Sequence, residues 1–291
     1  RRAVAEKAGG RVLECMAAGP GLQWTCENRA VGSTQGVITN VGSDHLEVRG
    51  RRLDDVERSL AGTTPAKAKL FAAETAYAPY LARRAEAKGS TFQLTDPSAV
   101  SDDDLKPFDY VEFTENVSLA LDVCESAGVD RDTALAGMWT VRPDVGALDL
   151  TPVTAPGRDI RFVNAFAAND PESTARIWEH LNLGERPDEA VVLYNNRADR
   201  MRRARDLSRL FGGAITAGRY VLVGEATAQL ADLFARRVPR DRILDLGGLP
   251  TDEAWPTLLE TCGERSVIVG VGNIGGAGLA LLDLMREEAD T

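Results

Sequence analysis

The chain has 291 residues, of which 44% are apolar, enough to bury the cores of roughly two domains of about 150 residues each. Its formal charge of −10 argues against a general nucleic-acid surface, because phosphate binding requires a basic excess over a contiguous face. No apolar run reaches the roughly 20 residues of a membrane-spanning helix, and residues 1–10 lack the apolar centre of a signal peptide. We therefore expect a soluble, cytoplasmic protein. Its four cysteines contain no Cys-x-x-Cys pair and are expected to be reduced packing residues.

Short runs rich in Val, Ile and Leu alternate with amphipathic stretches along most of the chain. The runs predict buried strands at 11–16, 35–42, 69–73, 91–95, 109–113, 161–166, 190–195, 219–224, 242–246 and 266–271. The clearest helical stretches are 77–88, 116–127, 171–183, 198–211 and 226–237. Continuous apolar strands separated by helices indicate an α/β fold with a mainly parallel sheet that is covered on both faces.

This alternation is interrupted between Val141 and Asp159, where three prolines and two glycines occur without a helical period. A boundary near residue 157 gives a first domain of residues 1–157 and a second of residues 158–291, of usual domain size. Residues 1–9 are expected to form a helix that enters the first strand directly. Because a parallel sheet usually begins with a βα unit, this predicts a further N-terminal segment.

Two polar residues are expected at neighbouring strand ends. Glu14 lies inside the apolar run 12–16, and His45 follows the strand at 35–42. Open α/β sheets bind ligands at the carboxyl edge of their strands, and a buried carboxylate requires a partner or a metal ion. The pair therefore indicates a metal-nucleotide site, although Glu14 could be a paired structural carboxylate and His45 an ordinary loop histidine.

Seven sequence phrases together resemble one family, the ligase subunits of bacterial poly-γ-glutamate synthases within the Mur ligase superfamily. These phrases, in family order and spacing, are 13–17, 40–45, 113–121, 143–147, 162–170, 196–200 and 270–277. The resemblance implies a central ATP-binding domain and a Rossmann-like C-terminal domain. It also implies ATP and Mg²⁺ as cofactors, with Glu14 and His45 as metal ligands.

The resemblance suggests roles for further residues. The segment 65–71 is similar to one in which the lysine, here Lys67, is carbamylated and binds a second Mg²⁺; the alternative is a solvated lysine. Asn116 matches a residue that faces the adenine, and it also suits the N-cap of a helix. The family's ribose-binding aspartate falls at Asn164 or Ala165, and Asn169 lies in the same phrase. We expect Asn164 and Asn169 to contact the nucleotide.

The turn 196–200 follows a strand and opens a helix, so its backbone N–H groups and arginines are suited to an anion. We expect Arg197, Asp199 and Arg200 to contact substrate or nucleotide. The alternative is a helix start with a surface basic patch that continues through residues 202–205, where Arg203 is expected to be solvated.

The run from Gly270 to Gly275 fits Gly-x-Gly-x-x-Gly, but only 16 residues follow Gly275, too few for the second strand of a dinucleotide-binding unit. The NAD interpretation therefore fails. A tight turn that brings the backbone close to a ligand or to the neighbouring domain remains.

The resemblance implies an ATP-dependent amide ligase that polymerises glutamate through γ-carboxyl amide bonds. Expected partners are glutamate, the poly-γ-glutamate chain, an integral-membrane synthase subunit that holds the protein at the inner face of the membrane, and further copies of the chain. The sequence contains no Gly-Lys-Ser/Thr, so the phosphate-binding loop of such ligases is missing and the chain alone is expected to be inactive. Two alternatives remain: another Mur-type ligase acting on folate or cell-wall precursors, and a non-catalytic scaffold subunit.

Overall fold

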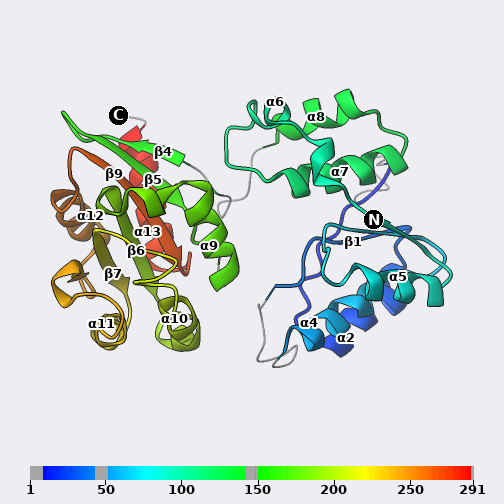
Figure 1. Ribbon diagram of the computed structural model, residues 1–291, viewed down its shortest axis with the longest axis horizontal. Helices are drawn as coiled ribbons and strands as arrows, with labels where there is room; N and C mark the ends of the chain where they lie inside the picture. The colour runs from blue at the N-terminus through cyan, green and yellow to red at the C-terminus, as the bar shows by residue number, and fades with distance from the viewer. Residues whose placement is uncertain (1–8, 43–51, 142–147, 149, 169, 290–291) are drawn as a thin grey trace. The chain divides into compact units, whose positions relative to one another are not determined.

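The computed structural model describes residues 9–42, 52–141, 148, 150–168 and 170–289, with side chains described as far as Met285. The chain forms two compact units (Figure 1). The first comprises residues 1–101 and 114–131, and the second comprises residues 102–113 and 132–291. Each unit contains its own sheet, so each is described by itself.

The first unit is built on a parallel sheet of three strands in the order β1-β2-β3. These strands are β1 (Gln35–Ile38), β2 (Lys69–Ala72) and β3 (Thr91–Leu94). The accompanying helices are α2 (Pro20–Thr25), the π-helical turn η1 (Cys26–Val31), α4 (Leu53–Leu60), α5 (Ala78–Ala87) and α7 (Thr114–Ser126), with short 3-10 turns η2 (Ala61–Thr63) and η3 (Pro97–Ala99). A small core of Leu70, Ala72, Leu81 and their neighbours holds the helices on the sheet.

The strand expected at residues 11–16 is wrong. These residues form no regular structure, and Val12, Leu13 and Met16 are among the most exposed apolar side chains of the described residues. A strand needs a neighbour to pair its backbone groups. Among the described residues, the first sheet consists of β1, β2 and β3, so the apolar run alone did not produce a buried strand.

The second unit contains a six-stranded sheet in the order β4-β5-β9-β6-β7-β8. All pairs are parallel except β4 with β5. The strands are β4 (Leu150–Val153), β5 (Asp159–Asn164), β6 (Ala190–Asn196), β7 (Arg219–Gly224), β8 (Ile243–Asp245) and β9 (Arg265–Gly272). Every residue of β6 is buried, as expected of a central parallel strand that is covered on both faces. The prediction of a mainly parallel α/β fold is confirmed.

Helices cover both faces of this second sheet (Figure 1). The helices of the unit are α6 (Asp102–Leu105), α8 (Arg131–Trp139), α9 (Pro171–His180), α10 (Met201–Ser208), α11 (Thr227–Phe234), α12 (Thr251–Glu260) and α13 (Ala277–Ala289). Short 3-10 turns are η4 (Leu183–Glu185), η5 (Pro187–Glu189), η6 (Ala198–Arg200) and η7 (Arg240–Arg242). One core packs α9, α10 and α11 against the sheet, and the other packs α12 and α13 against its opposite face.

The start of α9 shows how the sequence sets a helix boundary. The side chain of Asp170 accepts a hydrogen bond from the backbone N–H of Ser173 at 2.9 Å, and Pro171 occupies the first helical position. Both features favour a helix N-terminus, because one supplies an acceptor for an orphan donor and the other has a suitable fixed φ. The helix predicted at 171–183 therefore forms, three residues shorter at its end.

The strand expected at 109–113 is also wrong. This segment is irregular, although the backbone N–H of Val111 donates to the carbonyl of Leu148 at 2.8 Å. Phe113 instead packs on α9, where its ring lies 5.7 Å from that of His180 and 5.0 Å from the guanidinium carbon of Arg176. The apolar run therefore anchors a connecting segment to a helix.

Of the helices in the described part of the chain, none combines the length and apolarity that crossing a membrane requires.

Candidate active site

The topology of the second sheet places a switch point, where the connecting helices change faces, at the carboxyl end of β9. The helices after β5 and β6 pack on one face of the sheet, whereas α13, which follows β9, packs on the other face. Neighbouring strands whose connections leave on opposite faces open a crevice beyond their carboxyl ends, and open α/β sheets bind ligands there. We call this region the β9 crevice; it is bordered by Asn164, the turn 195–200 and the turn 272–276.

Two asparagines join the strand ends of the β9 crevice. The Nδ2 atom of Asn195 donates to the carbonyls of Asn273 at 2.5 Å and Gly275 at 2.8 Å. In return, the backbone N–H of Asn273 donates to the carbonyl of Asn195 at 3.0 Å, and its Nδ2 donates to the same oxygen at 3.2 Å. Both asparagines are buried, at 0% and 4% exposed. The side chains therefore replace sheet hydrogen bonds where the ladder ends, and they fix the glycine turn.

Three glycines permit this close packing. Gly224 and Gly272 have φ of 88° and 99°, and a side chain at either would collide with the 195–196 backbone. Gly278 lets Asn195 approach the start of α13, since a Cβ there would lie 2.9 Å from its Nδ2. The tight turn predicted for the glycine run is present, and its backbone lies close to Asn195 of the same unit; a close approach to a ligand or to the neighbouring domain stays a prediction.

The side chains of Arg197, Asp199 and Arg200 are exposed and lie together at the mouth of the crevice. Arg197 makes two hydrogen bonds to the Asp199 carboxylate, at 3.1 and 3.0 Å, and Arg200 lies 3.7 Å from the same carboxylate. A Cβ atom placed on Gly275 would lie 3.6 Å from Nη1 of Arg197. This arginine therefore extends over the glycine turn. The backbone N–H of Ala198 donates to Oε2 of Glu225 at 2.9 Å, which holds the turn against the end of β7.

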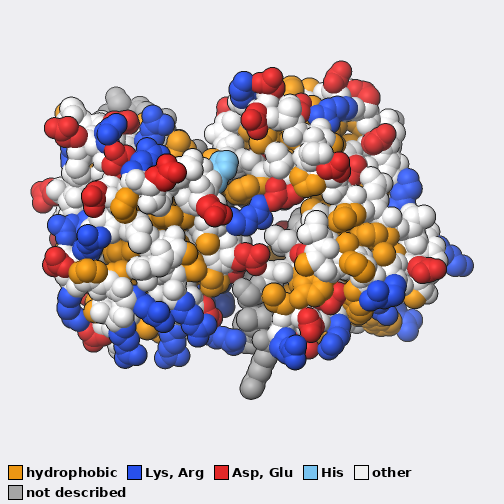
Figure 2. All heavy atoms as spheres, in the orientation of Figure 1, with side chains coloured by type: hydrophobic (Ala, Val, Ile, Leu, Met, Phe, Trp, Pro, Cys, Tyr) orange, Lys and Arg blue, Asp and Glu red, His pale blue; other side chains and the backbone are white. Residues whose placement is uncertain are grey.

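Arg203 is not the solvated residue that the sequence led us to expect. It is half-buried, and its Nη1 donates to Oδ1 of Asn273 at 2.8 Å. By contrast, Arg202 on the same helix is exposed and lies 3.9 Å from Asp206. Figure 2 shows blue side chains, all of them arginines in this part of the sequence, gathered over α10 and α11 at the lower rim of the second unit in this view. The basic patch and the crevice arginines are therefore both present.

Asn164 ends β5 at the border of the crevice and is 6% exposed, while Asn169 lies outside the described residues. Tyr194 is fully buried beneath the turn, where its ring packs on Phe234. Burial strongly raises the pKa of the Tyr194 hydroxyl, so that this group stays protonated at neutral pH. We therefore assign it to packing.

In the first unit, the structure does not bring the predicted site residues to one edge of the sheet. Glu14 is exposed in the irregular segment described above, and His45 lies outside the described residues. Lys67 is exposed, with φ of 53°, two residues before the amino end of β2. Because β1 and β2 are parallel, Lys67 lies at the edge of the sheet opposite to the carboxyl end of β1, which leads toward His45.

Asn116 is exposed and lies inside the first turn of α7, which begins at Thr114, so the N-cap interpretation of Asn116 is wrong.

A carboxylate that was not predicted as a site residue occupies the carboxyl edge of the first sheet. Glu74 follows β2 and accepts a hydrogen bond from the backbone N–H of Val41 at 2.9 Å, just after β1. Its position directly after a predicted strand was the available signal.

The residues at the β9 crevice suit an anionic ligand. The start of α13 presents backbone N–H groups beside Gly275 and Gly276, and Arg197 lies over the same turn. The N-terminus of a helix and a guanidinium both favour phosphate or carboxylate groups. Among the described residues, which do not include His45, no group of three acidic, histidine or cysteine side chains could hold a Mg²⁺ ion.

Comparison with known proteins identifies close relatives. Residues 150–288 match the family model described as the poly-gamma-glutamate synthase CapB C-terminal domain. The chain is 34% identical over 289 residues to PGA synthase CapB of Bacillus subtilis (strain 168), covering 99% of this chain and 73% of that protein. It is 36% identical over 279 residues to the capsule biosynthesis protein CapB of Bacillus anthracis, covering 95% of this chain and 60% of that protein.

Solved structures show the same fold at low sequence identity. A bifunctional folylpolyglutamate synthase/dihydrofolate synthase of Yersinia pestis, complexed with AMPPNP and a Mn ion, matches with a TM-score of 0.65 at 13% identity, over 88% of this chain and 62% of that one. MurF of Acinetobacter baumannii matches with a TM-score of 0.62 at 12% identity, over 94% of this chain and 63% of that one. The chain therefore belongs to the CapB family of poly-γ-glutamate synthases and has the α/β fold of the Mur ligases.

Proposed function

We propose that this chain is part of an ATP-dependent amide ligase that polymerises glutamate through γ-carboxyl amide bonds. The observation that carries the proposal is the β9 crevice, where Arg197 and the start of α13 face the same glycine turn, in a chain that belongs to the CapB family. The fold relative from Yersinia pestis binds an ATP analogue and Mn, which supports ATP and a divalent ion as the cofactors here.

The proposed reaction has two steps. The γ-phosphoryl group of ATP is transferred to the γ-carboxylate of a glutamate, which gives an acyl phosphate and ADP. The α-amino group of a second glutamate then attacks the acyl carbon, the amide bond forms, and inorganic phosphate leaves. Arg197 and Arg200 hold anionic groups of the nucleotide or glutamate, with Asp199 orienting both guanidinium groups.

Divalent metal supplies charge neutralisation on the phosphates when it is bound. We propose Glu14 and His45 as its ligands, from the family resemblance, and Asn116, Asn164 and Asn169 as nucleotide contacts. Lys67, two residues before the amino end of β2, is proposed to bind a second ion in its carbamylated form.

Three further proposals concern the assembly. We propose that the 291 residues alone do not hydrolyse ATP in a glutamate-dependent way, because they contain no Gly-Lys-Ser/Thr to hold the phosphates. We also propose an integral-membrane synthase subunit as the partner that holds the protein at the inner face of the membrane. Homo-oligomers of this chain are a third proposal.

The test compares three arginine variants of the full-length enzyme. Arg197→Ala and Arg200→Ala are expected to lower glutamate-dependent ADP release by at least about tenfold, since each removes a charged hydrogen-bond donor from the crevice. Arg202→Ala is the matched control, because Arg202 is equally charged, exposed and on the adjoining helix. Equal effects of all three substitutions would show a diffuse surface charge and no specific site. Full-length protein that binds its partner but releases no ADP would support the scaffold alternative.

A further inference from the structure

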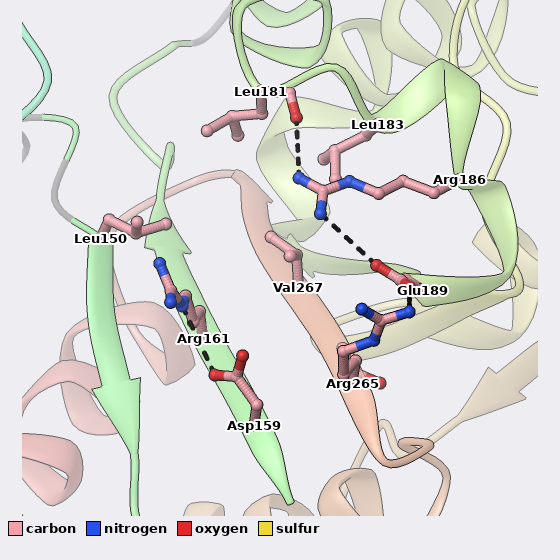
Figure 3. Close-up of a pocket in the computed structure, with 10 residues that line it drawn as sticks. Leu150, Asp159, Arg161, Leu181, Leu183, Arg186, Glu189, Arg265 and Val267 are labelled. Atoms are coloured by element: carbon pink, nitrogen blue, oxygen red, sulfur yellow. Dashed lines mark hydrogen bonds and ion pairs between the residues drawn. The ribbon is translucent and has the colours of Figure 1, made fainter.

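A cavity lies at the opposite edge of the sheet from the β9 crevice. It has a volume of about 230 Å³ and is bounded by residues near the amino ends of β5, β6 and β9 (Figure 3). From Val267 to Gly272 the strand β9 rises about 3.3 Å per residue, so the two places are roughly 17 Å apart. We call this cavity the amino-edge pocket. Nothing in the proposed chemistry uses it.

Arginines surround the amino-edge pocket. Arg161 projects from β5, and Arg186 and Arg265 come from the segment before η5 and from the start of β9. Figure 3 shows Arg161 on one side of the Val267 side chain, with Arg186 and Arg265 on the other. Three arginines are balanced by only two acidic residues of the lining, Asp159 and Glu189, in a chain whose formal charge is −10. The pocket is therefore a local cationic site on an acidic protein.

The arginines retain capacity to bind another anion. Glu189 is shared by two of them, at 3.5 Å from Nη1 of Arg186 and 3.0 Å from Nη2 of Arg265. Arg161 makes one long hydrogen bond, from Nε to Asp159 at 3.5 Å, so both of its Nη groups keep their donors. A guanidinium has five N–H donors and binds a carboxylate best in a two-point contact. Exposed ion pairs contribute little stability and rearrange readily.

The size and lining of the pocket narrow the ligand class. The cavity volume is that of roughly eight water molecules, and a γ-glutamyl residue has about nine non-hydrogen atoms. The cavity therefore suits one such residue. The apolar part of the lining includes Val267, Leu150 and Leu183. A methylene chain against these side chains, with a carboxylate between guanidinium groups, fits this arrangement.

We propose that the amino-edge pocket binds one glutamyl residue of the poly-γ-glutamate chain through its free α-carboxylate. This site would hold the product at a distance from the β9 crevice. The choice of polymer rests on the proposed function, because a γ-linked chain presents one free carboxylate at each residue. A site that holds the product apart from the reaction centre keeps an anionic polymer associated with an acidic enzyme between additions.

The test measures binding of a synthetic γ-linked hexaglutamate to the full-length protein by calorimetry, without ATP, so that it does not depend on ligase activity. Arg161→Gln is expected to weaken binding by at least about tenfold, because it removes a charged donor. Asp159→Asn is expected to tighten binding, because it removes the carboxylate that competes for Arg161. The two substitutions are thus expected to change the affinity in opposite directions. Damage to the fold would instead weaken binding in both variants.

The control uses an Arg–Asp ion pair elsewhere in the second unit. Arg240 of η7 lies 2.8 Å from Asp232 of α11, and both side chains are about as exposed as those of Arg161 and Asp159. Arg240→Gln and Asp232→Asn should leave hexaglutamate binding unchanged. Unchanged binding in the two pocket variants would overturn the proposal, as would equal affinity of the pocket for inorganic phosphate. If the native full-length protein shows no ligase activity but binds hexaglutamate in an Arg161-dependent way, the proposed function is overturned and the proposed binding site is supported.

Discussion

Arg203 donates a hydrogen bond from Nη1 to Oδ1 of Asn273 at 2.8 Å, and so joins α10 to the turn that follows β9. Asn273 in turn bonds to Asn195, so the three residues connect one helix and two strand ends. Residues that act in such a network affect stability together, and its geometry sets the shape of the crevice.

The first prediction concerns this hydrogen bond. Arg203→Met, which keeps an apolar stem but removes the donor, should lower the free energy of unfolding by about 1–3 kcal/mol, as expected for a hydrogen bond from a charged group. Arg202→Met on the same helix should change it by less than about 0.5 kcal/mol, because Arg202 is exposed. Urea denaturation of both variants checks the difference, and similar values would show that Arg203 is a surface residue in solution.

The second prediction tests the role of Asn195 as a donor. Asn195→Ala should lower the free energy of unfolding by about 2–4 kcal/mol, since two hydrogen bonds are lost and two carbonyls lose their partner. Asn195→Asp should be at least as damaging, although it is nearly the same size, because it places a carboxylate against the carbonyls of Asn273 and Gly275. An Asp variant as stable as the native protein in urea denaturation would contradict the assigned geometry.

The third prediction separates backbone strain from close contact at two glycines. Gly276→Ala meets a φ of 70° but no atom within 4 Å, so it should cost only about 1 kcal/mol. Gly224→Ala meets a φ of 88° and also collides with Asn196, so it should cost at least about 3 kcal/mol or prevent folding. Thermal unfolding of the two variants measures the difference. Equal costs would mean that the end of β7 shifts freely.

The fourth prediction concerns pH. Glu57 is buried on α4, and desolvation, followed by the charge of Asp54, raises the pKa of its carboxyl group above the usual 4.5. A raised pKa in the folded state means that the ionised form destabilises the fold above that pKa, and that the penalty disappears as pH falls toward the unfolded value. Glu57→Gln should therefore raise the melting temperature at pH 7 and lose this advantage near pH 4. The control is Glu86→Gln on exposed surface, which should show no such trend.

The fifth prediction addresses Glu14, whose metal role remains a proposal. Because this side chain is exposed in an irregular segment, Glu14→Ala should leave the melting temperature within about 1 °C of the native value. If Glu14 is a metal ligand in the full-length enzyme, the same variant should need at least about tenfold more Mg²⁺ for half-maximal ADP release. A normal Mg²⁺ dependence would remove Glu14 from the site, and a large loss of stability would make it structural.

The strands of the second sheet were predictable because most are buried on both faces. The runs at 190–195, 219–224 and 266–271 contain almost only apolar residues, and each forms a strand within one or two residues of its predicted bounds. The strand β4 was missed because it is an edge strand of four residues that contains Pro152, and such strands lack a continuous apolar run. Local composition thus identifies central strands better than edges.

The candidate site was only partly predictable for a related reason. The turn at 196–200 was found because arginines directly follow a buried strand. Asn195, Asn273 and Arg203 were not identified as a network, since their contact depends on β9 lying beside β6, and no short-range pattern encodes that order. Arg203 looks like its neighbours in sequence, and only the rotation of α10 on the sheet distinguishes it from Arg202.

The position of β9 has a consequence for how the chain acquires its structure during synthesis. This strand is the last of the second unit to be made, yet it lies between β5 and β6, so both of those strands wait for it to complete their pairing. Until residue 272 has left the ribosome, β5 and β6 each have an unpaired edge and expose side chains that are buried in the finished sheet. Unpaired edges and exposed apolar side chains promote aggregation of partly synthesised chains. Synthesis that stops before Arg265 should therefore yield a protein divided down the middle of its sheet, and one that needs a chaperone.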